Sequence, residues 1–128
     1  MDRAALVQAY RGYIACLNGR DWDELGRFVD AEVCYNGEPI GLHGYRRMLA
    51  ADVAAIPDLR FVVELLVADP PFVASRLAFD CTPVGTLFDL PVNGRQAQFK
   101  ENVFYEFGAG RITDVRSVID KAAIAAQL

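Results

Sequence analysis

The sequence predicts an α+β domain in which helices pack on one face of an antiparallel sheet. The first half of the chain places apolar residues at helical spacing, whereas the second half consists of strand-like runs rich in Val, Phe, Ile and Tyr. The chain has 128 residues and no repeat, linker or low-complexity segment. It is therefore expected to form a single domain over residues 1–128.

The helices are expected first. Residues 2–18 carry one apolar stripe at helical spacing, with Asp2 as the N-cap. A short second helix and a brief strand at residues 31–36 follow. A third helix is expected over residues 45–56, and it ends there because Pro57 cannot continue a helix.

Four strand-like runs fill the remainder of the chain: residues 59–68, 72–81, 95–107 and 111–120. The short turns "DPP" and "GAG" join the first pair and the last pair, and the long segment "TPVGTLFDLPVNG" separates the two middle runs. Strands that follow one another through short turns pair as antiparallel hairpins, which supports the predicted sheet.

The run at residues 95–107 contains the most informative alternation, because successive side chains of a strand point to opposite faces. One set is polar at five of its six positions, whereas the set with Phe99, Glu101 and Val103 is mostly apolar and must face the helices. A carboxylate in such surroundings is either paired or has its pKa raised by desolvation, which makes Glu101 a candidate general acid/base. Two structural alternatives stay open: an ion pair with an arginine, or a bulge that turns Glu101 toward solvent.

The last strand contains an obvious acidic candidate, Asp120. The alternation places Ile112, Asp114 and Asp120 in one set, which the charges indicate to be the solvated outer face. Ser117 belongs to the other set and is expected on the inner face. Asp120 is therefore not expected to be the catalytic acid.

The composition argues against several classes of function. A net charge of −4 without a basic cluster argues against nucleic acid as a partner. One histidine and three dispersed cysteines do not supply a zinc site, and nucleotide-binding glycine motifs are absent, so no metal and no cofactor are expected. His43 is interpreted as a loop or capping residue rather than a base. No apolar run approaches the roughly 20 residues of a membrane span, and we expect a cytoplasmic protein with no membrane partner.

Three segments carry a resemblance to a known family: "NGRDWDELGRFV", "TPVGTLFDLPVNGRQAQF" and "GAGRITDVRSVID". With the helices and the sheet, they resemble the SnoaL-like polyketide cyclases of the NTF2-like superfamily over nearly the whole chain. The resemblance implies a cone of curved antiparallel sheet that N-terminal helices close around a deep apolar pocket. It also implies a cofactor-independent enzyme that acts on a small apolar carbonyl compound by acid/base proton transfer, as a cyclase or an isomerase.

The resemblance also implies where the chemistry lies. Family members that catalyse an aldol cyclisation use an aspartate in the middle of the last strand and a histidine on the preceding strand. The matching positions here are Ser117 and Val103, so both familiar groups are replaced. We therefore expect Glu101 and Ser117 to form the catalytic site. The expected substrate-binding residues lie on the inner faces: Tyr13, Leu17, Tyr35, Phe99, Val103 and Tyr105.

Three questions stay open from the sequence. The tyrosines are either hydroxyl donors to an oxyanion or ordinary core aromatics. With both familiar catalytic groups replaced, the domain is either a polyketide cyclase-like enzyme or a non-catalytic small-molecule-binding module. In the family the outer sheet face is often a dimer interface, and we expect a homodimer with polar contacts at Lys100, Asn102, Asp114 and Arg116.

Overall fold

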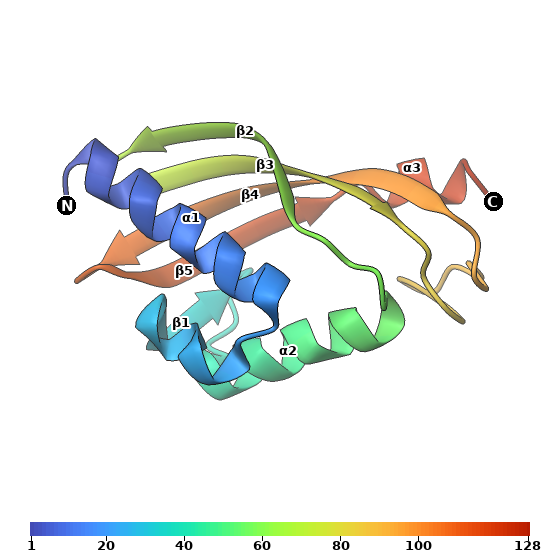
Figure 1. Ribbon diagram of the computed structural model, residues 1–128, viewed down its shortest axis with the longest axis horizontal. Helices are drawn as coiled ribbons and strands as arrows, with labels where there is room; N and C mark the ends of the chain where they lie inside the picture. Colours follow the sequence, from blue (N-terminus) through green and yellow to red (C-terminus); the bar gives the residue numbers. More distant parts are fainter.

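The computed structural model describes all 128 residues and has helices on one face of a curved five-stranded sheet (Figure 1). The expected α+β fold is confirmed. The elements in chain order are α1 (Arg3–Gly19), the 3-10 helix η1 (Trp22–Arg27), β1 (Val29–Tyr35), α2 (Gly41–Ala55), β2 (Val62–Asp69), β3 (Phe72–Cys81), β4 (Ala97–Gly108), β5 (Arg111–Ile119) and α3 (Lys121–Ala125).

The sheet has the strand order β1-β5-β4-β3-β2. Strands β2 to β5 pair antiparallel through their short connections, as expected, whereas β1 runs parallel to β5. A parallel pair needs a long connection, and here the chain passes through α2 and three strands before it returns. The sheet is therefore mixed rather than purely antiparallel.

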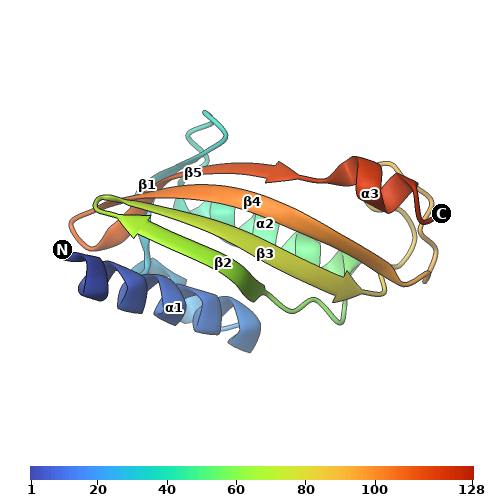
Figure 2. The ribbon, with the colours of Figure 1, turned by 90° about the horizontal axis from the view of Figure 1, so that it is seen from above.

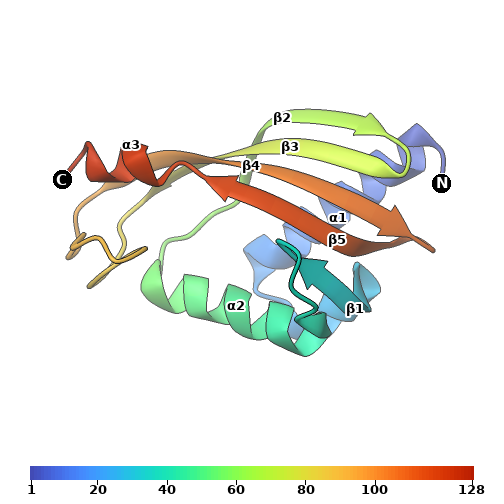
Figure 3. The ribbon, with the colours of Figure 1, turned by 180° about the vertical axis from the view of Figure 1, so that it is seen from behind.

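Helices α1 and α2 bury their apolar faces beneath the sheet. The side chain of Asp2 caps α1 by accepting a hydrogen bond from the N–H of Ala5 at 2.8 Å, as the sequence predicts. Tyr10 and Tyr13 of α1 are buried in the core. Figure 3 shows α2 and β1 below strands β2 to β5, with α1 behind them. This arrangement brings α1, α2 and the inner sheet face around one interior.

The two faces of the sheet differ as the alternation in β3 and β4 predicts. Phe99, Val103 and Tyr105 are buried on the inner face of β4, whereas Phe104 is 60% exposed on the outer face. No helix covers the outer face, which lies toward the viewer in Figure 2. The inner face and the helices therefore contain the interior of the molecule, and the outer face is available to solvent or to a partner.

The face assignment in the last strand was wrong at Ile112. Ile112 is fully buried, although the alternation places it in the same set as the exposed Asp120. The cause is a bulge, because Phe107 pairs with Ile112 while its neighbour Glu106 pairs with Asp114. Because of the extra residue, the side chains that precede it in the strand point to the sheet face opposite to the one that the alternation predicts. Ser117 lies after the bulge and keeps its expected inner position.

Candidate active site

A cavity of about 200 Å³ lies between the inner face of the sheet and helices α1 and α2. Of its 20 lining residues, 18 are hydrophobic, and the two exceptions are the carboxylic acids Glu101 and Asp52. This volume exceeds that of an engineered cavity of about 150 Å³ that binds benzene. The space is therefore large enough for a molecule with one ring.

The structure brings the sequence-predicted site residues together. All six expected binding residues border this cavity, and so does Glu101. Ser117 does not border it, but its hydroxyl donates a hydrogen bond to the carboxylate of Glu101. Phe88, from the long loop between β3 and β4, also lines the cavity and covers part of it. Its ring lies 4.9 Å from Nζ of Lys121, which links the loop to α3.

Glu101 has neither of the two structural explanations that the sequence left open. It forms no ion pair, and its strand pairs regularly there, with Leu77 on one side and Ile119 on the other. Burial raises the pKa of Glu101, because the ionised carboxylate loses water. The hydrogen bond from Ser117 opposes that rise, and the nearby carboxyl of Asp52 adds to it. Glu101 is therefore a desolvated carboxyl group at the cavity wall.

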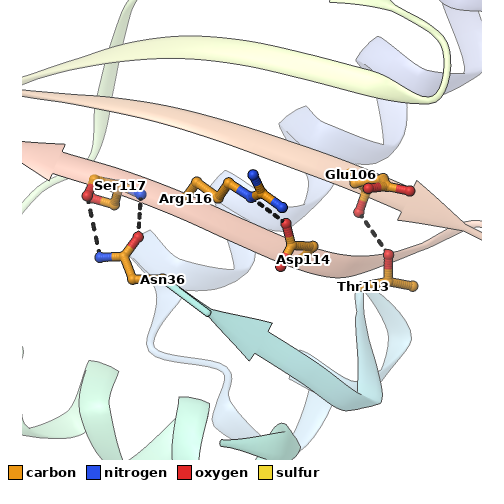
Figure 4. A network of polar contacts seen from close by, with 6 residues as sticks. All are labelled: Asn36, Glu106, Thr113, Asp114, Arg116 and Ser117. Atoms are coloured by element: carbon orange, nitrogen blue, oxygen red, sulfur yellow. Dashed lines mark hydrogen bonds and ion pairs between the residues drawn. The ribbon is translucent and has the colours of Figure 1, made fainter. Parts of the chain in front are cut away.

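Asn36 holds the backbone of Ser117 in place, as Figure 4 shows. The side-chain oxygen of Asn36 accepts a hydrogen bond from the N–H of Ser117 at 2.8 Å, and its side-chain nitrogen donates one to the Ser117 carbonyl at 3.2 Å. Asn36 adopts φ 48°, a left-handed conformation that asparagine tolerates better than most residues. The end of β1 thereby fixes the residue that contacts Glu101.

Tyrosine hydroxyls cluster on the side of the cavity formed by α1 and α2. The hydroxyls of Tyr13 and Tyr45 lie 2.6 Å apart and share a hydrogen bond. Burial raises the pKa of Tyr13, Tyr45 and Tyr105 well above the ordinary value, and it also raises the pKa of Tyr35. These phenols remain protonated near neutral pH, so each has an O–H group that is able to donate a hydrogen bond. Tyr45 was not among the residues predicted from the sequence.

Asp52 is the second residue that sequence reasoning missed. It lies on α2, where burial raises its pKa to about 6, and it makes no side-chain hydrogen bond or ion pair. The signal was present, because Asp52 continues the buried face of α2 formed by Tyr45, Leu49 and Ile56 at spacings of three and four residues. The helical period places this carboxyl inward, as the strand period does for Glu101.

Asp120 and His43 lie outside the cavity. The carboxylate of Asp120 caps α3 by accepting a hydrogen bond from the N–H of Ala123 at 3.1 Å, and the residue is exposed. His43 is exposed in the first turn of α2. Asp120 therefore has a structural role at a helix start, and His43 does not line the cavity.

No metal-binding arrangement of His, Cys, Asp and Glu side chains is present. The three cysteines are free thiols, and burial raises the pKa of Cys16 and that of Cys81, the latter to about 11. No helix is long and apolar enough to cross a membrane. The titratable groups that border the cavity are therefore the two carboxyls and the tyrosines alone.

A mixed, curved sheet closed by helices around an apolar cavity defines an NTF2-like domain. The family model of the SnoaL-like polyketide cyclases matches residues 7–128, and the chain belongs to that family. A crystal structure of a SnoaL-like polyketide cyclase from Agrobacterium tumefaciens is 53% identical, with a TM-score of 0.95 over 99% of this chain and 98% of that one. TsrD from Streptomyces laurentii shares the fold at 20% identity, with a TM-score of 0.87 over 99% of this chain and 96% of that one. The comparison with curated proteins gave no match.

Proposed function

We propose that this protein is a cofactor-independent enzyme that moves a proton on a small, largely apolar carbonyl compound, with Glu101 as the acid/base. The observation that carries the proposal is the desolvated carboxyl of Glu101, which faces an apolar cavity and is held by Ser117. A carboxyl with a raised pKa is a better base once ionised and a better acid near neutral pH than a solvated one. The family to which the chain belongs supports the same class of chemistry.

In the proposed reaction, the Glu101 carboxylate removes a proton from the carbon next to the carbonyl group. The electron pair of the broken C–H bond forms a C=C bond, and the π pair of the carbonyl group moves onto its oxygen, so that the compound becomes an enolate. Protonated tyrosine hydroxyls at the cavity wall, Tyr35 foremost, donate hydrogen bonds to that oxygen. In a compound with a neighbouring C=C bond, Glu101 then returns the proton to a different carbon, which isomerises the compound. Alternatively, the enolate carbon attacks a second carbonyl of the same molecule and closes a ring, and protonated Glu101 returns its proton to the alkoxide that forms.

Ser117 is a positioning residue in this scheme. Its hydroxyl stabilises the ionised form of Glu101, and the Asn36 contacts hold Ser117 in the strand. It occupies the place where the family resemblance puts a catalytic aspartate. The negative charge is thereby moved from the last strand to the neighbouring one, with the serine as its hydrogen-bond partner.

Exchange of carbon-bound hydrogen for deuterium in small cyclic ketones tests the proposal by proton NMR. The wild type is expected to accelerate exchange, and Glu101→Gln is expected to lower the enzymatic rate on the order of 100-fold or more, which is typical of a general base. Glu106→Gln is the matched control, because Glu106 lies on the same strand but on the outer face. An exchange rate that Glu101→Gln leaves unchanged contradicts the assignment.

The second candidate is a binding module with the same cavity and no turnover. The replacement of the familiar catalytic pair by Ser117 and Val103 favours it. Saturable binding of a ketone without any acceleration of deuterium exchange is the result that selects this candidate.

We also propose that two copies of the chain associate through the outer sheet face. Its exposed apolar side chains come from all four antiparallel strands: Val62, Leu65, Val67, Phe72, Phe104 and Val118. The polar contact expected at this face is partly satisfied within one chain, because Lys100 and Arg76 pair with Glu64 and Arg116 pairs with Asp114. The proposed interface therefore consists of apolar side chains, and the charged side chains on the same face are paired within each copy.

A further inference from the structure

The cavity has an unbalanced charge. Its wall carries two carboxyl groups, Glu101 on the sheet and Asp52 on α2, and no lysine, arginine or histidine lines it. Neither carboxyl forms an ion pair, and Asp52 makes no side-chain hydrogen bond at all. An ionised carboxylate in apolar surroundings is costly unless it is paired. The missing partner must come from the ligand or from solvent.

We propose that the cavity selects small ligands in which a protonated amine is attached to an apolar body, with Asp52 as the counter-ion, and that it rejects carboxylates and phosphates. This inference rests on the proposed function only in taking the same cavity as the site. It adds a substrate class, namely a carbonyl compound that also carries an amine.

The shape and the lining of the cavity support an amine rather than an anion. Aromatic side chains line the cavity together with the two carboxyls, among them Tyr35 of β1, Tyr45 of α2, Phe99 of β4 and Phe88 of the loop between β3 and β4. Aromatic faces attract ammonium groups, and this attraction grows when water is excluded. An anionic ligand meets two like charges and no cation, so its desolvation is uncompensated.

Glu101 and Asp52 have different surroundings and therefore different roles in this proposal. Glu101 already accepts a hydrogen bond from the Ser117 hydroxyl, whereas the side chain of Asp52 makes no hydrogen bond or ion pair. The other titratable groups that line the cavity are tyrosines of α1, β1, α2 and β4, all of which remain protonated near neutral pH. An ammonium group therefore gains most beside Asp52. Glu101 stays free for proton transfer.

Four probes with one ring test the inference: cyclohexylamine, cyclohexanol, cyclohexanone and cyclohexanecarboxylate. Binding is followed at pH 7.5, which lies above the Asp52 pKa of about 6, by NMR shifts of the methyl groups of Leu49 and Ile119, which line the cavity. Cyclohexylamine is expected to bind at least about tenfold more tightly than cyclohexanol, and the carboxylate is expected not to bind, as like charge in a dry site requires.

Asp52→Asn keeps the shape of the side chain and is expected to bring the affinity for cyclohexylamine down to that for cyclohexanol. Asp23→Asn, at an exposed position of η1, is the matched control and is expected to retain the preference. The inference is overturned if cyclohexanol or the carboxylate binds as tightly as the amine, if the amine shifts neither methyl signal, or if Asp52→Asn keeps the preference. If one of these results occurs but cyclohexanone still exchanges its carbon-bound hydrogen for deuterium in a Glu101-dependent way, the amine inference is wrong and the proposed function holds. If the cavity prefers the amine but no exchange occurs, the amine inference holds and the proposed catalysis is wrong.

Discussion

At the scale of single residues, the site depends on two carboxyls that opposite walls bring into one apolar cavity. Glu101 could be found from the sequence, because one strand contains the whole alternation that turns it inward. Asp52 could also have been placed inward from the helical period of α2. Its proximity to Glu101 could not be predicted, because residues of α2 and β4 meet only through the packing of the helix beneath the sheet.

The coupling of the two carboxyls predicts how Glu101 titrates. We expect carbon-13 NMR to show a pKa of Glu101 above the ordinary glutamate value, since burial disfavours the charged form. Asp52→Asn is expected to lower this pKa because it removes a neighbouring negative charge. Ser117→Ala is expected to raise it, because the lost hydrogen bond stabilises the ionised carboxylate. An ordinary or lowered pKa in the wild type contradicts the desolvated site.

The raised pKa of Asp52 also predicts that the stability of the protein depends on pH. Its pKa rises from 3.8 to about 6 on folding, so the folded state binds the proton more tightly. The contribution of this residue is thus fully present below pH 3.8 and is lost as the pH rises through about 6. The loss amounts to about 3 kcal/mol at 1.36 kcal/mol per pKa unit.

Urea unfolding at pH 4 and pH 8 measures this effect. From pH 4 to pH 8, the free energy of unfolding of Asp52→Asn is expected to rise by about 2–3 kcal/mol relative to that of the wild type, because asparagine carries no charge at either pH. Asp23→Asn is expected to show no such change. A difference between Asp52→Asn and the wild type that stays constant with pH excludes a desolvated Asp52.

At the scale of elements, the contact between β1 and β5 positions the strand that carries Ser117. Asn36→Gly removes both hydrogen bonds to the Ser117 backbone but keeps the left-handed conformation, which glycine adopts easily. We expect a loss of about 1–2 kcal/mol in the free energy of unfolding and faster amide exchange at Ser117. Asn102→Ala, on the outer face of β4, is the control. If amide exchange at Ser117 is unchanged in Asn36→Gly, the two Asn36 hydrogen bonds do not hold the Ser117 backbone in place.

The start of α3 provides a second element-scale prediction, about the acidic residue that ends the last strand. Asp120→Ala is expected to cost about 1 kcal/mol of stability because it removes the N-cap, whereas Asp120→Asn retains a capping side chain and costs less. Both variants are expected to exchange ketone deuterium at the wild-type rate. A large loss of rate in Asp120→Asn gives Asp120 a catalytic role that the structure does not assign to it.

At the scale of the whole molecule, the uncovered sheet face predicts the oligomeric state. Val118 is 69% exposed on this face, and a charge there opposes burial between two copies. Light scattering is expected to give a dimer for the wild type and a monomer for Val118→Glu. Val84→Glu, at an exposed valine of the loop between β3 and β4, is expected to remain dimeric. A monomeric wild type at working concentrations rules the interface out.

The sequence by itself determined the features that lie within one element. The stripe of α1, its cap at Asp2, the end of α2 before Pro57 and the inward face of β4 all follow from local period and backbone chemistry. Only the tertiary structure decided the parallel pairing of β1 with β5, the bulge that buries Ile112, and the meeting of Asp52 with Glu101. The physical reason is that a period fixes which face a side chain occupies, whereas its neighbours across that face are set by how separate elements pack.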